Sequence, residues 1–143
     1  MRAEVRVADE LVGRIERGLL LFVGVEKADA EADADATARK VAALRIFPGR
    51  TPMDLTIGDV GGGCLVVSQF TLCAALGKGN RPSFEPAADP AHAEPLYLRV
   101  ADALRATGLT VATGRFGADM AVELVNDGPV TFWLETKAGS LLK

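Results

Sequence analysis

Apolar and polar side chains alternate over the first 25 residues in a pattern that predicts three β-strands. Residues 3–7 alternate as a strand does when one face meets water, residues 9–10 predict a turn, and residues 11–15 continue the alternation in a return strand. The run of residues 19–25, which follows a glycine, is largely apolar at successive positions. Such a run is typical of a central strand that is covered on both faces.

Two segments change to the period of an amphipathic helix. Residues 29–44 place apolar side chains every three or four positions, with acidic residues early and basic residues late, which suits the helix dipole. A second helix is predicted to begin at Asp89, a capping residue followed by proline, and to end near Gly108. Because Pro95 lacks a backbone N–H group, we expect that helix to start late or to kink.

Further short apolar runs predict strands at residues 53–57, 63–72, 109–113, 121–125 and 130–134. Residues 74–88 predict a loop rich in glycine, proline and alanine, and the tail from Lys137 is expected to fray. This order of elements favours an α+β fold with mostly antiparallel pairing. We therefore predict a single domain over residues 1–143, with a barrel-like β-sheet and two main helices packed outside it.

Composition and charge narrow the classes of function. The chain of 143 residues is 49% hydrophobic and 24% charged, so it has enough apolar material for a core. Lys and Arg number 16 against 19 Asp and Glu, which gives a net charge of -3 and argues against a broad basic face that clamps nucleic acid. A small nucleic-acid pocket with local Arg or Lys side chains is still compatible with this balance. The sequence shows no signal peptide and no transmembrane run, so we expect a soluble cytoplasmic protein without a membrane partner.

The run of residues 63–72 changes from apolar to polar near its end, where Ser68, Gln69 and Thr71 take the place of aliphatic side chains. Buried polar groups cost free energy unless they are hydrogen-bonded. The cluster therefore has local partners or a ligand, or it marks a strand end that surfaces in water. The residues alone leave these alternatives open.

A second polar segment, residues 126–131, reads Asn-Asp-Gly-Pro-Val-Thr between two apolar runs. These residue types favour an ordinary tight turn. The Gly128–Pro129 peptide bond can also be cis at small cost, and a cis bond would hold the neighbouring carbonyl groups as a rigid pair of acceptors. Such a pair could hold an ammonium group or exclude a side chain of one handedness, so the segment is either a structural turn or a functional gate.

The chain offers little for nucleophilic or metal-dependent catalysis. Cys64 and Cys73 match no metal-ligand spacing and form no C-x-x-C pair. The single histidine, His92, lies where a helix begins, and we expect a surface role for it. A thiol or serine hydrolase that uses Cys73 or Ser68 is one hypothesis, but it lacks a neighbouring base. We predict that the protein uses no metal and no cofactor.

The two polar segments together resemble the paired signatures of the D-aminoacyl-tRNA deacylase family, of the D-Tyr-tRNA deacylase type. The signatures are Ser68-Gln69-Phe70-Thr71-Leu72 and Asn126-Asp127-Gly128-Pro129-Val130-Thr131. Four further family-like segments stand in the same order, at residues 17–20, 44–47, 81–84 and 113–120. The resemblance extends from Arg2 to Leu134, and two separated motifs with four collinear segments are more specific than either motif alone.

The resemblance implies a metal-independent hydrolase of the ester that joins a D-amino acid, or glycine, to the 3′-terminal adenosine of tRNA. It also implies a homodimer with its active sites at the subunit interface. Gly128 and Pro129 of one subunit would form the chirality gate of the other. Ser68, Gln69 and the backbone amide of Phe70 would position the ester and stabilise the oxyanion, an effect commonly worth about 3–4 kcal/mol.

Thr71 completes the implied catalytic set, although no base is in view to turn its hydroxyl into a nucleophile. The family is thought to use the 2′-hydroxyl of the terminal ribose and little side-chain chemistry, which can be enough for an activated ester that is well oriented. We further expect Met120 and Phe84 to wall the adenine pocket and Arg81 to contact the substrate.

The sequence departs from the family pattern at three places. The family's opening strand, with its Gln-Arg-Val segment, would precede Arg2, which leaves the alternatives of a start assigned too late and a real truncation. Ala75 stands where the family often has Asp, and Pro52 interrupts the usual Lys-Met-Asn sequence. The missing strand motivates an alternative function, a tRNA acceptor-end binding protein of the same fold without turnover.

Overall fold

The N-terminal strands form an antiparallel sheet in the computed structural model, which describes residues 2–128 and 130–142. β1 (Ala3–Val7) pairs with β2 (Glu10–Ile15), and β6 (Ala121–Leu124) pairs with the other edge of β1. The strands predicted from the alternation of residues 3–7 and 11–15 are therefore confirmed, as is the strand predicted at residues 121–125. In β1, however, Glu4 is only 7% exposed, so this strand does not turn a full face to water.

A second sheet is parallel and has β4 (Gly63–Ser68) at its centre, between β3 (Gly18–Val23) and β5 (Thr110–Thr113). The prediction that the run containing β3 is the central, covered strand is wrong. β3 lies at the edge of this sheet, its residues are half-buried and Phe22 is 41% exposed. Residues 64–67 of β4 are instead 0–1% exposed, because both faces of this strand are covered.

Two helices pack on the parallel sheet, α1 (Glu31–Ala43) and α2 (Pro90–Ala106). α2 begins as predicted, since the Asp89 carboxylate accepts a hydrogen bond of 2.9 Å from the backbone N–H three residues later. The helix ends before Gly108, whose φ of +93° suits glycine. Pro95 lies within the helix and does not delay its start. In the described part of the chain, neither helix is long and apolar enough to cross a lipid bilayer.

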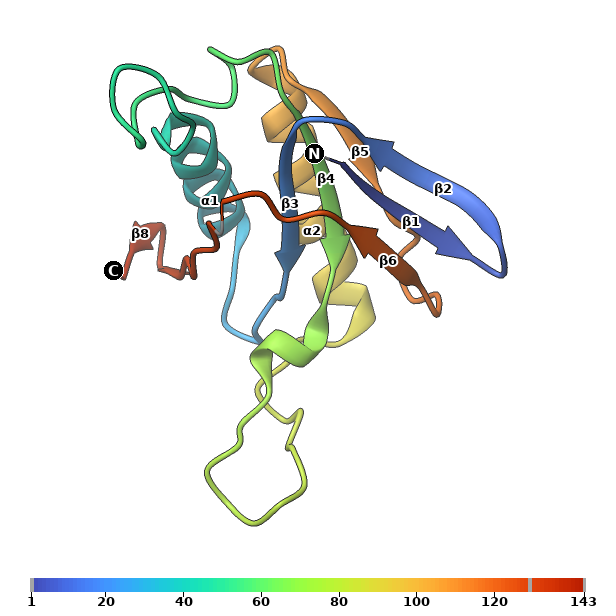
Figure 1. Cartoon of the computed structure of the whole chain (residues 1–143). Helices are drawn as coiled ribbons and strands as arrows, with labels where there is room; N and C mark the ends of the chain where they lie inside the picture. The colour runs from blue at the N-terminus through green and yellow to red at the C-terminus, as the bar shows by residue number, and fades with distance from the viewer. Residues whose placement is uncertain (1, 129, 143) are drawn as a thin grey trace.

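The core consists of two apolar clusters that meet on β4. Cys64 and Val66 belong to the cluster beneath the helices, whereas Leu65 and Val67 belong to the cluster shared with the antiparallel sheet. The chain is thus layered as helices, parallel sheet and antiparallel sheet (Figure 1). The α+β class is confirmed.

The predicted barrel-like arrangement is not supported, because the strands of the described residues form separate sheets and do not close into a barrel. Antiparallel pairing holds for β1 with β2 and for β1 with β6, whereas both pairings of β4 are parallel. Parallel neighbours need long crossover connections, and here α1 and α2 provide them and cover one face of the sheet.

Three other predicted strands are absent or shorter than expected. Residues 53–57 form no strand, and only Leu55 among them makes an isolated antiparallel bridge, to Phe47. The run of residues 63–72 leaves the sheet at Ser68, where β4 ends. Residues 130–134 have no regular structure, because no strand among the described residues pairs with them.

The C-terminal tail was expected to fray, but it folds back on α1 as a small hairpin. β7 (Thr136–Lys137) pairs with β8 (Ser140–Leu141) beside the helix (Figure 1). The carboxylate of Asp33, which is only 5% exposed, accepts hydrogen bonds of 3.0 Å from the backbone N–H groups of Ala30 and Gly139. One buried acid therefore secures both the start of α1 and the hairpin.

Candidate active site

The predicted catalytic residues gather where β4 leaves the parallel sheet. Ser68 is the last residue of β4 and pairs with Val23, the last residue of β3. The backbone N–H of Gln69 donates a hydrogen bond of 2.8 Å to the Val23 carbonyl. The chain then turns into the 3-10 helix η1 (Phe70–Cys73), which lies at the lower end of β4 in Figure 1.

The polar cluster therefore does not continue the strand, as the sequence had suggested, but surfaces at its end. Ser68 and Gln69 are half-buried, whereas Phe70 and Thr71 are exposed. The Gln69 side chain has a local partner, because its Nε2 atom donates a hydrogen bond of 2.5 Å to the Thr71 hydroxyl. The structure thus combines two of the alternatives, a strand end that surfaces and a cluster with its own hydrogen bond.

Two backbone donors are available at this turn. The first N–H groups of a 3-10 helix have no acceptor within the helix. Among the described backbone hydrogen bonds none uses the N–H of Phe70 or of Thr71, while the N–H of Leu72 donates to the Gln69 carbonyl at 3.2 Å. Two successive amides at the surface, beside a fixed Gln69 side chain, can orient a carbonyl oxygen and stabilise negative charge on it.

Gly24 makes this arrangement possible, although the sequence analysis did not single it out. A Cβ atom placed on Gly24 would lie 2.9 Å from the Cys73 sulfur and 3.2 Å from the Gln69 carbonyl oxygen. The start and the end of the η1 segment therefore both pack directly on the Gly24 backbone. The available signal was a lone glycine inside an apolar run, which often marks a close backbone approach.

Of the three predicted substrate contacts, the structure brings Phe84 to the cluster. The rings of Phe84 and Phe70 pack edge to face with their centroids 5.1 Å apart, and they are 42% and 53% exposed. Arg81 lies on the exposed loop that precedes Phe84. Met120 is half-buried and packs in the cluster between the two sheets, with its sulfur 2.7 Å from the position of a Cβ on Gly114. Its packing is that of a core residue.

The predicted gate lies elsewhere in the same chain. Pro129 is outside the described residues, and Gly128 is exposed with a φ of +147°. The amide of Asn126 donates a hydrogen bond of 3.1 Å to the Thr131 hydroxyl, which closes the segment. Figure 1 shows this segment after β6, on its way to α1, away from the lower end of β4 where η1 lies. Within one chain, the segment after β6 therefore does not meet the turn at the lower end of β4.

The cysteines and the histidine show no sign of an activated nucleophile. Burial raises the pKa of the Cys64 thiol to about 11. Burial first, and then the charges of Glu26 and Asp29, also raise the pKa of the Cys73 thiol. The Nε2 atom of His92 lies 2.7 Å from the Asp29 carbonyl oxygen. Within the described residues, no group of three His, Cys, Asp or Glu side chains could hold a metal ion.

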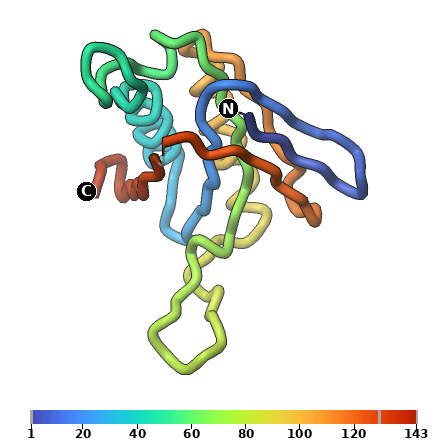
Figure 2. The backbone as a smooth tube through the Cα atoms, viewed as in Figure 1, coloured from blue at the N-terminus to red at the C-terminus, as the bar shows by residue number. Residues whose placement is uncertain are grey.

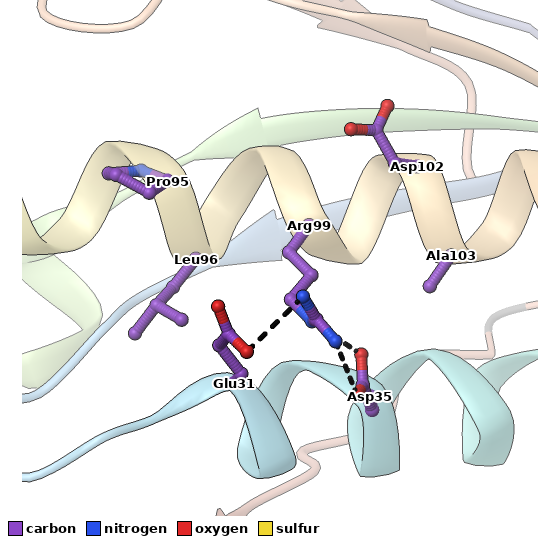
Figure 3. A pocket seen from close by; sticks show the side chains of 7 residues that line it. All are labelled: Glu31, Asp35, Pro95, Leu96, Arg99, Asp102 and Ala103. Carbon is purple, nitrogen blue, oxygen red and sulfur yellow. Dashed lines mark hydrogen bonds and ion pairs between the residues drawn. The ribbon is translucent and has the colours of Figure 1, made fainter.

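A recess of about 460 Å³ lies between α1 and α2, away from the turn of residues 68–71 (Figure 3). Arg99 points across it and pairs with Asp35 at 2.8 Å and with Glu31 at 3.4 Å. Asp102, at its rim, pairs with Arg105 at 2.9 Å. Arg99 links the two helices through its pairs with both acids of α1. With the pair on α2 included, three carboxylates face two guanidinium groups, so the recess keeps one negative charge.

Solved structures with the same backbone arrangement define the class of the protein. The chain superposes with a TM-score of 0.89 on the c-Myc DNA Unwinding Element Binding Protein, with 36% identity over 96% of this chain and 94% of that one. It also superposes with a TM-score of 0.77 on a probable eukaryotic D-amino acid tRNA deacylase, with 15% identity over 89% of this chain and 90% of that one. The shared arrangement is an α+β deacylase fold.

Sequence comparison is more specific. The chain is 56% identical over 135 residues to a D-aminoacyl-tRNA deacylase of Geobacter metallireducens, which covers 94% of this chain and 89% of that protein. A D-aminoacyl-tRNA deacylase of Paracoccus denitrificans is 53% identical over 136 residues, with 94% and 91% covered. The family model for D-Tyr-tRNA(Tyr) deacylase matches residues 1–135. The chain belongs to the D-Tyr-tRNA(Tyr) deacylase family, and the resemblance noted in the sequence is confirmed.

Proposed function

We propose that this protein hydrolyses the ester between a D-amino acid and the 3′-terminal adenosine of tRNA, and so releases D-amino acids that were attached by mistake. The observation that carries this proposal is the turn of residues 68–71 at the end of β4, in a chain that the family model matches over residues 1–135. Such a substrate agrees with the cytoplasmic location expected from the sequence.

In the proposed reaction, the turn acts mainly by orientation and by charge stabilisation. The N–H groups of Phe70 and Thr71 and the Gln69 side chain face the carbonyl oxygen of the ester as it gains negative charge. Water adds to the carbonyl carbon, the bond to the ribose 3′-oxygen breaks, and that oxygen takes up a proton with help from the neighbouring 2′-hydroxyl. Donors of this kind are each worth about 3–4 kcal/mol in acyl transfer. The Thr71 hydroxyl fixes Gln69 and is not the nucleophile.

We also propose that the gate is supplied by a second copy of the chain. Within one chain, the segment that follows β6 runs away from the lower end of β4, so a gate in this segment needs a partner subunit in order to reach the turn. Exposed apolar side chains stand on both sides of these residues: Leu124 and Val125 at 45%, Phe132 at 59% and Trp133 at 60%. Apolar surface of this kind around a functional segment is typical of an interface.

Selectivity would follow from steric exclusion. A rigid main-chain gate leaves space for hydrogen at one position of the α-carbon and none for a side chain, so L-amino acids are rejected. Glycine has no side chain to exclude, and we expect glycyl-tRNA to be cleaved as well.

The test compares D-Tyr-tRNA, L-Tyr-tRNA and glycyl-tRNA as substrates of the wild-type protein and of Gln69→Ala. We expect rapid release of D-tyrosine, slow release of L-tyrosine, and a loss of about 10²-fold in kcat for Gln69→Ala. Equal rates on the two tyrosyl substrates would contradict the gate. Tight binding of D-Tyr-tRNA without release would contradict the activity and favour a binding protein of the same fold.

A further inference from the structure

The loop after η1 projects from the body of the protein as a hairpin-like arm (Figures 1 and 2). At its base, the backbone groups of Ala75 and Ser83 exchange two hydrogen bonds, of 2.8 Å and 2.9 Å. Next to this bridge, Phe84 packs on Phe70 of the candidate turn. The arm, residues 76–82, is therefore attached to the candidate active site at both of its ends.

The arm is basic in a chain that is acidic overall. From Gln69 to Phe84 the sequence contains no Asp or Glu, whereas it contains Lys78 and Arg81, against a net charge of -3 for the whole chain. Both basic side chains are exposed. The first acid beyond the arm, Glu85, forms an ion pair of 3.6 Å with Lys27.

These two cations differ from most others on the surface. Eight basic residues form ion pairs with acids: Arg2, Arg6, Arg14, Lys27, Arg45, Arg99, Arg105 and Arg115. Over residues 2–128 and 130–142, no hydrogen bond or ion pair engages the side chain of Lys78 or Arg81. Two unpaired cations on an arm free of acids suit an anionic partner.

We propose that Lys78 and Arg81 bind the phosphates of the single-stranded 3′ end of tRNA that lead to the terminal adenosine. This inference rests on the proposed function, which places the adenosine at the turn of residues 68–71. Lys78 is three residues from Ala75, and Arg81 is two from Ser83, so both lie within about 10 Å of the bridge along the chain. The arm would hold the single-stranded 3′ end of the tRNA while the turn of residues 68–71 promotes cleavage of the ester.

The first test measures the binding of uncharged tRNA, so it does not depend on hydrolysis. Each phosphate contact on a single strand contributes about 0.7 to the slope of log affinity against log salt. We expect Lys78→Gln/Arg81→Gln to lower that slope by about 1.4, so that wild-type affinity falls about 7-fold more than the variant's between 50 and 200 mM salt. Arg39→Gln/Lys40→Gln on α1 removes the same charge away from the arm and should leave the slope unchanged. An unchanged slope in the arm variant would overturn the proposal.

The second test uses two substrates of the proposed reaction, D-Tyr-tRNA and D-tyrosyl-adenosine, which has no phosphate. Lys78→Gln should raise KM several-fold for the tRNA and match the wild type on the adenosine ester, and Lys78→Arg should restore the tRNA value. An equal loss on both substrates would overturn the phosphate role. If the wild-type protein cleaved neither substrate, the proposed function would fail, whereas the binding measurement would still decide the role of the arm.

Discussion

The hydrogen bond between Gln69 and Thr71 gives each side chain of the turn a definite task. The Thr71 hydroxyl accepts a hydrogen bond from the Gln69 amide, and no His, Lys, Asp or Glu side chain among the described residues forms a hydrogen bond with it. A hydroxyl that is engaged as an acceptor and has no base is a poor nucleophile. The side chain is therefore better understood as the support that fixes the direction of the Gln69 amide.

Replacing Thr71 by valine, which has nearly the same shape, separates the two roles. We expect Thr71→Val to lower kcat for D-Tyr-tRNA by about tenfold or less, because one supporting hydrogen bond contributes about 1 kcal/mol. Loss of a true nucleophile would cost roughly 10⁴-fold or more. Single-turnover kinetics on folded protein distinguish these outcomes, and a loss of the larger size would return Thr71 to the role of nucleophile.

A buried thiol gives a prediction about pH. The Cys64 thiol has a pKa of about 11 in the folded chain, because burial disfavours the thiolate, against about 8.5 when unfolded. Between these values the unfolded chain binds fewer protons than the folded one, so stability falls as pH rises. We expect the free energy of unfolding to drop by about 1.4 kcal/mol per pH unit from this group.

Urea denaturation of the wild type and of Cys64→Ala between pH 7 and 10.5 isolates this effect. Near neutral pH, the substitution should lower the free energy of unfolding, since it leaves a small cavity. Above pH 8.5, the difference in free energy of unfolding between the two proteins should become smaller, because only the wild type loses stability through Cys64. Tyr97 and Cys73, whose pKa values burial also raises, are present in both proteins and cancel. A constant gap would show that Cys64 does not titrate in this range.

Local sequence signals located the elements well where neighbours along the chain decide the structure. Asp89 and the proline after it are sufficient for the start of α2, and the alternation of residues 3–7 and 11–15 is sufficient for the first hairpin. The order of the strands in the parallel sheet, by contrast, cannot be predicted from local signals. β4 lies between β3 and β5 because of crossovers that span about 40 residues each way, and no local pattern records that choice.

The ends of the apolar runs were harder to predict for the same reason. Residues 63–72 keep strand-like composition although polar residues enter the run, yet the strand ends at Ser68, where its partner β3 also ends. Residues 130–134 have strand-like composition but no partner in the described chain. The motif residues of the candidate site were found from the sequence, while the turn that shapes them follows from tertiary pairing.

Asp33 links α1 to the C-terminal hairpin, and its loss should loosen both. We expect Asp33→Ala to lower the free energy of unfolding by about 3 kcal/mol, because two part-buried backbone donors lose a buried, charged acceptor. Amide hydrogen exchange should accelerate at residues 136–142.

A chain that ends at residue 135 provides the matched comparison. The shortened chain lacks the N–H group of Gly139, one of the two that donate to Asp33. The loss in free energy of unfolding caused by Asp33→Ala should therefore be about half as large in it. An equal cost in the full-length and shortened chains would mean that the bond to Gly139 contributes nothing to stability.

At the level of the assembly, the apolar residues after the gate give the clearest prediction. If the proposed homodimer forms through these residues, Phe132→Ser/Trp133→Ser should yield monomers in sedimentation equilibrium and abolish cleavage of D-Tyr-tRNA, since each site would lose its gate. Leu98→Ser, an exposed apolar position on α2, serves as the matched control and should stay dimeric and active. A monomeric wild type with full activity would contradict the shared site.

The close approach at Gly24 has a consequence for how sequence variation in this protein should be interpreted. A β-carbon at that position would lie 2.9 Å from the Cys73 sulfur and 3.2 Å from the Gln69 carbonyl oxygen, so the η1 segment would have to shift. We expect Gly24→Ala to lower kcat for D-Tyr-tRNA while leaving tRNA affinity intact. In a mutational survey of activity, substitutions of this glycine would then be about as damaging as substitutions in the turn of residues 68–71. Such a position would be misjudged by any ranking based on distance to the ligand.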